Sequence, residues 1–180
     1  MPAPAHAATT VTATALWHEA AGARHFLICH PDRRTRADAL AGLLAAVNGL
    51  PDVTVWADHR TLDSVKQPDD LSVGYFAAAA RSTAEVLGLA AELADARASV
   101  LEGTNRWLFK PARQSRLILV LADLTAPAVG LSRARPALDR LLARGRRAAM
   151  PVAATADPSS TPRDLLQALA QTCQPWPQAA

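Results

Sequence analysis

Cysteine is scarce in this sequence, and its only two cysteines, Cys29 and Cys173, stand far apart. Two isolated thiols supply neither a disulfide framework nor a set of metal ligands. Cys29 falls within an apolar segment, where a thiol usually serves as a small buried hydrophobic group. We therefore expect neither a disulfide-stapled fold nor a structural metal site.

Long apolar runs are missing as well. No stretch reaches the roughly 18 consecutive apolar residues that a membrane-spanning helix needs. The N-terminal segment MPAPAHAATTVTATA has no basic start and no continuous apolar core, so it makes a poor signal peptide. These two absences predict a soluble, cytoplasmic protein without a membrane span.

Lysine occurs only at Lys66 and Lys110, so arginine carries nearly all of the positive charge. The formal net charge of +3 allows an anionic or nucleic-acid partner without requiring one. Half of the 180 residues are apolar and 19% are charged, which is typical of a folded chain and not of a disordered one. A chain of this length fits one domain with a core of ordinary size.

What the sequence does contain is an alternation of apolar segments with helical patterns. The apolar segments predict strands at residues 25–29, 53–57, 116–122 and 151–155. The helical patterns predict helices at residues 35–47, 82–102 and 135–147, and a last helix from residue 162. Such alternation is typical of an α/β fold with a doubly wound, mostly parallel sheet and helices on both faces. We expect residues 15–172 to form this single domain, between a flexible tail at 1–14 and a Pro-rich tail at 173–180.

Three short patterns mark where helices should begin. Thr35 with Asp38 resembles a capping box, and Ser82 with Glu85 is a second one. The pair Thr161-Pro162 predicts an N-cap residue followed by proline in the first helical position.

The carboxyl ends of the predicted strands should meet at one edge of the sheet, which is where α/β sheets of this kind bind ligands. That edge would gather residues 30–36, 58–60, 123–125 and 155–160. The topology alone brings these segments together, so their proximity does not by itself indicate a function.

Five segments of the chain form an ordered set, namely HFLICHPDRRTR, VTVWADHR, AEVLGLAAELADARASVLEG, RLILVLADL and ARGRRAAMPVAATADPSS. In order and spacing, over about residues 15–165, they resemble the motor domain of the FtsK/SpoIIIE/TraB DNA translocases. That family consists of P-loop ATPases that pump double-stranded DNA in cell division and conjugation. The resemblance implies a P-loop NTPase core of the RecA-like kind, and ATP with Mg²⁺ as the ancestral cofactors.

The phosphate-binding residues of that family are replaced in this chain. Its loop glycines fall on His30, Arg33 and Thr35, its lysine on Arg36 and its hydroxyl residue on Ala37. A P-loop needs glycines so that backbone N–H groups can approach the phosphates closely. It also needs the lysine for the β- and γ-phosphates and the hydroxyl for Mg²⁺.

The remaining catalytic positions of the family are reduced in the same way. Asp123 is the only acid left of the Walker B pair, Thr155 remains at the sensor-like position, and Ala156 stands in place of the sensor glutamine. We therefore predict that the chain does not hydrolyse ATP. No catalytic residue, metal ligand or cofactor is expected, since ATP and Mg²⁺ are implied by the resemblance alone.

Arginines supply the remaining candidates for an anion site. Arg33, Arg34 and Arg36 cluster at a predicted helix N-terminus, where the helix dipole and the positive charge both favour an anion. A solvated, arginine-rich turn explains the same residues and is the favoured interpretation. The degenerate phosphate-binding loop is thus predicted to comprise His30, Arg33, Arg34, Thr35 and Arg36.

A second basic set lies further along the chain. Arg140, Arg144 and Arg147 are predicted to share a helix face, which would contact a DNA backbone, an acidic partner surface or solvent. Asp123 would either bind a cation or cap a turn, and the cap is the favoured role. Asp58 and Arg60 are expected to form a local ion pair, and the apolar patch 107–109 to cover the core or to contact a partner.

Three functions are consistent with these residues. The first is a non-hydrolysing accessory or regulatory protein of a DNA translocation or transfer system, which binds an intact FtsK-like motor or a second copy of itself. The second is a nucleotide- or double-stranded-DNA-binding module that retains weak phosphate binding. The third is a small α/β enzyme that uses Asp123 or Asp58, and it lacks a nucleophile–base pair. We expect the first.

Overall fold

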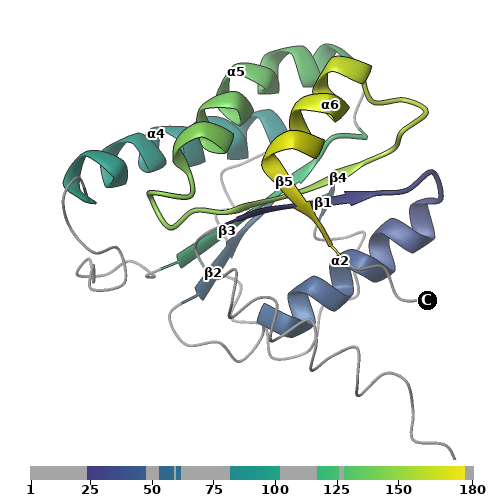
Figure 1. Ribbon diagram of the computed structural model, residues 1–180, viewed down its shortest axis with the longest axis horizontal. Helices are drawn as coiled ribbons and strands as arrows, with labels where there is room; N and C mark the ends of the chain where they lie inside the picture. The colour runs from purple at the N-terminus through teal and green to yellow at the C-terminus, as the bar shows by residue number, and fades with distance from the viewer. Residues whose placement is uncertain are drawn as a thin grey trace, which may run out of the picture.

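The computed structural model describes residues 24–47, 53–58, 60–61, 82–101, 117–125 and 128–176, and Figure 1 shows the arrangement of their helices and strands. Along the chain these elements are β1 (His25–Cys29), α2 (Arg33–Val47), β2 (Val53–Trp56), α4 (Thr83–Leu101), β3 (Leu117–Asp123), α5 (Ala128–Arg144), β4 (Val152–Ala156), α6 (Arg163–Thr172) and β5 (Cys173–Pro175). Within these residues, no helix is both long enough and apolar enough to cross a membrane.

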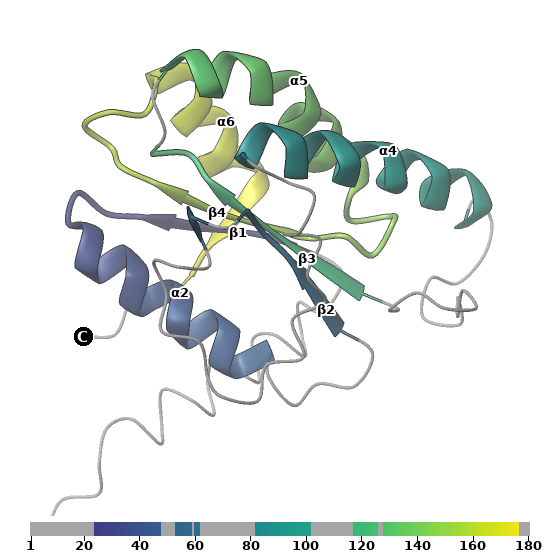
Figure 2. The same cartoon turned by 180° about the vertical axis from the view of Figure 1, so that it is seen from behind.

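The strands form one five-stranded sheet in the order β2-β3-β4-β1-β5, and every neighbouring pair is parallel. Helices cover both faces of this sheet. Helix α2 lies on one face, whereas α4, α5 and α6 lie together on the other (Figures 1 and 2). The predicted doubly wound α/β fold is therefore confirmed.

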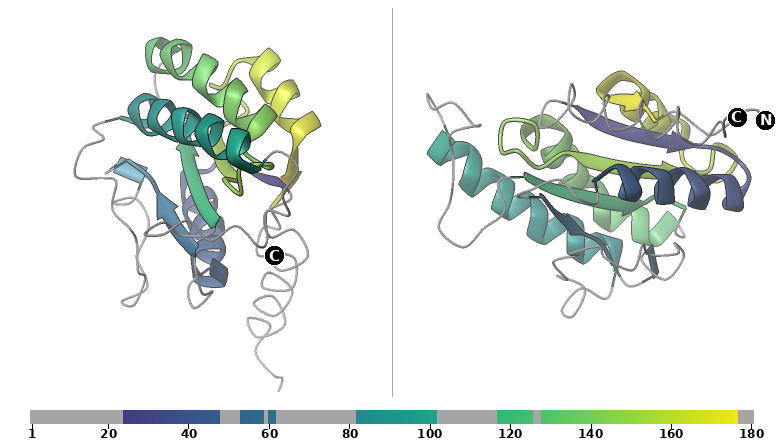
Figure 3. Two further views of the ribbon diagram at one scale, coloured as in Figure 1. Left: turned by 90° about the vertical axis from the view of Figure 1, so that its left-hand side faces the viewer. Right: turned by 90° about the horizontal axis from the view of Figure 1, so that it is seen from below.

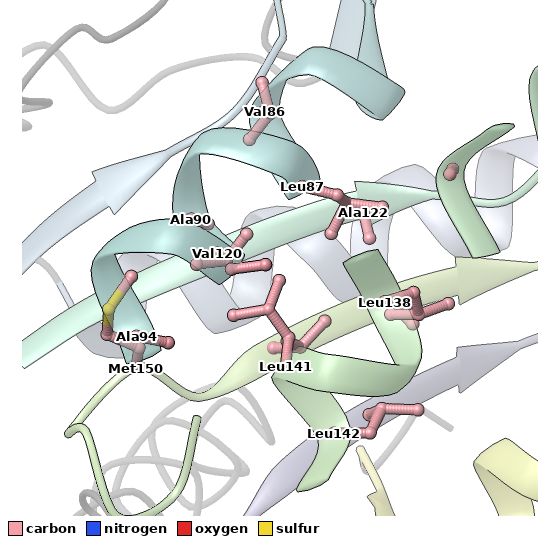
Figure 4. Close-up of a cluster of buried hydrophobic side chains, with 14 of the residues drawn as sticks. Val86, Leu87, Ala90, Ala94, Val120, Ala122, Leu138, Leu141, Leu142 and Met150 are labelled. Carbon is pink, nitrogen blue, oxygen red and sulfur yellow. The ribbon is translucent and has the colours of Figure 1, made fainter. Parts of the chain in front are cut away.

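The core on the three-helix side lies between α4, α5 and the strands β3 and β4 (Figure 4). Leu87 from α4 and Leu141 from α5 are fully buried there, next to Val120 and Ala122 of β3 and to Met150 before β4. Alanine occupies several inward positions of α4, including 90, 91 and 94, and all three are buried.

The core on the other face is built by a single helix. The predicted inward residues of α2 are all buried, namely Leu40, Leu43, Leu44 and Val47. They pack with residues of β1, β2 and β3 in one cluster, and the view from below shows α2 in front of the sheet (Figure 3, right). Phe26 of β1 and Trp176 complete this layer with an edge-to-face contact, their ring centroids 5.4 Å apart.

Two predicted boundaries need correction. Helix α5 does not run from Arg135 to Arg147, since it begins at Ala128 and ends at Arg144. Pro136 lies inside it, although proline removes one N–H group from a helix and normally marks a beginning. The helix ends where Gly145 starts a turn, with Met150 N donating to Gly145 O at 2.7 Å.

The tail predicted from Cys173 is also wrong in its first residues. Residues Cys173–Pro175 form β5, which pairs with β1 at the outer edge of the sheet. Three residues carry no recognisable periodicity, and proline is accepted here because an edge strand has one side without ladder hydrogen bonds. The patch at 107–109 and the tail at 1–14 lie outside the described residues.

Candidate functional site

The place for a ligand in this sheet is set by its topology. The chain leaves β1 towards α2 on one face, and it leaves the neighbouring strand β4 towards α6 on the other (Figure 1). Ligands of doubly wound sheets bind outside the carboxyl ends of the strands where the following segments diverge in this way. The candidate site therefore consists of the segments that follow β1, β4 and β3.

The segment after β1 is organised by Asp32. Its Oδ2 accepts hydrogen bonds from Thr35 N and Thr35 Oγ1, both at 2.8 Å, while Asp32 N donates to His30 Nδ1 at 3.0 Å. Asp32 is thus the N-cap of α2, and the predicted Thr35–Asp38 capping box is wrong because the helix already begins at Arg33. The hydrogen bonds from Thr35 hold the pKa of Asp32 below its usual value.

This cap changes what the N-terminus of α2 can accept. A helix N-terminus attracts anions because its first N–H groups and its dipole both favour negative charge. Here the Asp32 carboxylate already occupies that position, and both the amide and the hydroxyl of Thr35 point at it. An incoming phosphate would have to displace the Asp32 carboxylate, which is also negatively charged.

Arg36, the residue at the lysine position of the resembled loop, is turned inward. It is only 8% exposed, and its Nη1 donates to the carbonyl oxygens of His30 and Pro31, the latter at 2.9 Å. The same nitrogen lies 3.6 Å from Asp157 Oδ2 in the segment after β4. The guanidinium therefore joins the segments that follow β1 and β4.

Asp157 is fixed from its other side by the segment that it begins. Its Oδ1 accepts from Ser159 N at 2.8 Å and from Ser159 Oγ at 2.6 Å. These hydrogen bonds, with a smaller contribution from the charge of Arg36, lower the pKa of Asp157. Asp157 remains a carboxylate near neutral pH and balances the charge of Arg36.

The predicted arginine cluster is therefore divided. Arg36 is buried and paired, whereas Arg33 and Arg34 are exposed and form no ion pair with the part of the chain that the structure describes. Arg33 and Arg34 are solvated, as the favoured interpretation expected, but they lie in the first turn of α2 and not in a loop before it. It does not bring the three guanidinium groups together around one point.

Asp123 has the favoured role of a turn cap. Its Oδ1 accepts from Thr125 N at 3.0 Å, from Thr125 Oγ1 at 2.7 Å and from Thr155 Oγ1 at 3.2 Å. Asp123 and Thr155 are also register partners on β3 and β4. The Walker B-like and sensor-like positions therefore meet, and they bond to each other.

The other acid at this edge is structural as well. Asp58 is 4% exposed, and it accepts hydrogen bonds from Thr61 N at 2.8 Å and from Thr83 Oγ1. The carboxylate thus ties the end of β2 to the start of α4, in place of the expected pair with Arg60. Among the residues described, no cluster of acids, histidines and cysteines could hold a metal ion.

The basic face predicted on α5 is partly paired within the chain. Arg140 and Arg144 both pair with Asp95 of α4, with Arg144 Nη1 2.9 Å from Asp95 Oδ1. Arg147 lies in the turn after α5, exposed and off the face that the other two share. The three arginines therefore do not form the continuous stripe that the prediction assumed.

Neither cysteine is suited to nucleophilic chemistry. Burial, followed by the negative charge of Asp157, raises the pKa of Cys29. Burial raises the pKa of Cys173 to about 11. Both thiols are therefore protonated near neutral pH, although only Cys173 is buried and Cys29, expected to be buried, is partly exposed.

The prediction from sequence missed Asp32 and Asp157, the two acids that occupy the site. Asp32 had a readable signal, because it is an N-cap residue type placed directly before the first helical position. Asp157 had none, since its role depends on a contact with Arg36, which is far away in the sequence.

The predicted N-cap role of Thr161 is wrong. Its hydroxyl donates to Leu124 O at 3.5 Å, and the N-cap position of α6 is Pro162.

The chain is thus an α/β protein in which the charged side chains at the carboxyl ends of β1, β3 and β4 are bonded to other groups of the same chain. Comparisons of the chain with family models, with curated proteins and with solved structures found no match.

Proposed function

We propose that this chain is a non-hydrolysing accessory or regulatory protein of a DNA translocation or transfer system. Its domain would be a degenerate FtsK/SpoIIIE-like core, and it would act in the cytoplasm. It would act by binding a protein partner, such as an intact motor of that family or a second copy of itself. The order of the five resembling segments motivates the proposal. One structural observation supports it, namely that Asp32, Arg36 and Asp123 at the carboxyl ends of the strands are bonded to other groups of the chain.

Both features that could attract a phosphate here, the N-terminus of α2 and the guanidinium of Arg36, already have partners within the chain. The Asp32 carboxylate takes the anion position at α2, and the Arg36 guanidinium is bonded to carbonyls of its own loop. A polyphosphate would meet repulsion from Asp32 and would have to separate Arg36 from Asp157. Asp123 is similarly engaged with Thr125 and Thr155. This arrangement favours a protein-binding role over turnover of a nucleotide.

The test begins with nucleotide binding by the whole chain. With millimolar ATP and Mg²⁺, we expect no saturable heat in calorimetry and no release of phosphate. The variant Asp32→Ala removes the internal anion, and any gain in affinity for ATP in that variant would support internal occupation. Saturable binding by the unaltered chain that Arg36→Ala abolishes would contradict the proposal.

The second part of the test concerns partners. The chain is mixed with an intact FtsK-type motor domain, with and without double-stranded DNA, and analysed by size-exclusion chromatography with light scattering. Co-elution with the motor, or self-association, is the expected result. A complex with DNA alone, with affinity that falls steeply with salt, would favour the DNA-binding alternative.

The exposed pair Arg33 and Arg34 is what favours that alternative. The double variant Arg33→Ala, Arg34→Ala should leave association with a motor unchanged if the accessory role is right. If DNA binding is real, the same variant should weaken it and reduce its salt dependence. Arg133→Ala, another exposed arginine, serves as the matched control for a simple loss of charge.

A further inference from the structure

His25, the first residue of β1, is completely buried and makes two hydrogen bonds through its ring. Val152 N, at the start of β4, donates to His25 Nδ1 at 3.0 Å. His25 Nε2 lies 3.1 Å from Leu142 O, near the end of α5. Because Nδ1 accepts a hydrogen bond, the ring must be neutral with its proton on Nε2, which donates to Leu142 O.

The ring also packs against the turn that joins α5 to β4. A Cβ atom added to Gly145 would lie 3.3 Å from His25 Cε1, so ring and turn are in close contact. Within that turn, Ala149 has a φ of 55°, a left-handed conformation that costs energy for any residue with a side chain. The turn therefore depends on neighbouring contacts to hold its shape, and His25 is one of them.

Among the residues that the structure describes, no element packed around His25 offers its ring a compensating negative charge. Strand β4 has no titratable side chain, β5 contributes the neutral thiol of Cys173 as register partner, and Arg24 precedes His25 in the chain. The turn contributes Arg146 and Arg147, and α5 ends in Arg144. Burial, opposed by the Leu142 hydrogen bond and assisted by Arg146, lowers the pKa of His25 to about 4.

We propose that His25 is a protonation-sensitive latch that fastens the α5–β4 turn to β1. Protonation would place a hydrogen on Nδ1 opposite the N–H group of Val152, so two donors would face each other. It would also create a buried positive charge near Arg146. Mild acid should therefore release the turn from β1.

The pH window follows from the two pKa values. The unfolded histidine titrates near 6.5 and the folded one near 4, so the folded state binds fewer protons between these values. The stability that depends on a neutral His25 is complete above pH 6.5, and it is lost as the pH falls towards 4. At pH 5 the equilibrium constant for opening should be about 30-fold higher than at pH 7.5. Asp32, Asp95 and Asp157, whose pKa values are lowered from 3.8, contribute below this window.

Two measurements on the full chain test the latch. NMR of histidine-labelled protein should show His25 titrating near pH 4. Hydrogen exchange at Val152 N–H, corrected for the intrinsic effect of pH, should show the roughly 30-fold rise in opening between pH 7.5 and 5. Titration of His25 near 6.5, or opening that does not depend on pH, would overturn the proposal.

The variant His25→Gln provides the matched comparison, because an amide offers one donor and one acceptor and does not titrate. Opening in this variant should be nearly flat across the window, whereas His30→Gln should keep the pH dependence of the unaltered chain. An unchanged pH dependence in His25→Gln would also overturn the latch. If that variant does not fold, the titration and exchange of the unaltered chain decide the question alone.

Discussion

Arg36 shows how the chemistry of one side chain can redirect a loop. Lysine would bring a compact ammonium group, which can point outward as a single charge towards a phosphate. The planar guanidinium carries several donors, and here it reaches two carbonyl oxygens of its own loop and the carboxylate of Asp157. Arg36 carries the same charge as a lysine would, but it links the segments after β1 and β4 to each other and does not point outward.

Gly145 offers a prediction at the same scale. A Cβ atom there would lie 2.5 Å from Met150 O and 2.6 Å from Leu141 O, closer than real Cβ contacts allow. Gly145→Ala must therefore move backbone on both sides of the turn. We expect a loss of about 1–3 kcal/mol in the free energy of unfolding, measured by urea denaturation.

Gly42 and Gly88 provide the controls for that substitution. Both lie inside helices, and a Cβ atom at either position meets nothing within 4 Å. Alanine should therefore stabilise the chain at each of these sites by about 0.5–1 kcal/mol. Equal effects at all three glycines would show that the close approach at Gly145 is not significant.

Single residues were predictable from the sequence only where their role is local. Asp32 follows from its position before a helix, and Asp123 from its position at the end of an apolar strand. Asp157, which faces Arg36, and Val152, which bonds to His25, are more than 100 positions away from those residues, and no local pattern encodes either contact. The sequence therefore indicated which segments gather at the carboxyl ends of the strands, but not the contact between Arg36 and Asp157 that joins two of them.

At the scale of elements, α4 and α5 are joined at their exposed edge by Asp95. This carboxylate pairs with Arg140 and Arg144, and the hydrogen bond from Arg140 is the main cause that lowers its pKa. Asp95→Asn should reduce the free energy of unfolding by about 0.5–1 kcal/mol at low salt, as expected for a partly exposed pair. Chemical denaturation at low and high salt measures this difference, which should shrink as salt increases.

Asp139→Asn is the matched control for the α4–α5 contact. Asp139 pairs with Arg135 four residues earlier on the same helix, so its loss should weaken α5 without affecting α4. The pairing of Asp95 also fades as the pH falls below its unfolded value of 3.8, because the folded pKa is lower. A salt-independent effect of Asp95→Asn would mean that the ion pairs contribute nothing.

Elements with a strong period were predicted well, and elements without one were not. The inward faces of α2 and α5 match the burial of Leu43, Leu44, Leu138 and Leu141. The first half of α5 was not predicted, because a proline such as Pro136 normally indicates the first turn of a helix and not its interior. The strand β5 forms because it pairs with β1, and a three-residue segment is too short to show a strand pattern in the sequence.

At the scale of the whole molecule, the class of the fold followed from the sequence and the strand order did not. Alternating strands and helices indicate a parallel sheet, but they do not say which strands are neighbours. The order β2-β3-β4-β1-β5 places β1 between two strands from the C-terminal part of the chain. Removing β5 should therefore expose the edge of an otherwise internal strand.

Truncation after Thr172 tests this dependence. It removes β5, the hydrogen bond from Trp176 N to Leu27 O, and the contact between Trp176 and Phe26. We expect the shortened chain to aggregate or to lose most of its stability, as measured by light scattering and thermal unfolding. Truncation after Trp176 keeps β5 and serves as the control, and equal behaviour of the two chains would contradict the role of β5.

The position of β1 also has a consequence for how the protein is made. His25 and its partner Val152 are 127 positions apart, so at about 5–20 residues per second the ribosome delivers β4 roughly 6–25 s after β1. During that interval α2 can pack against β1, but both hydrogen-bonding edges of the strand await partners. Newly made chains therefore carry an unpaired β1 until β4 and β5 have been synthesised, and yield in cells should depend on how well chaperones protect that strand.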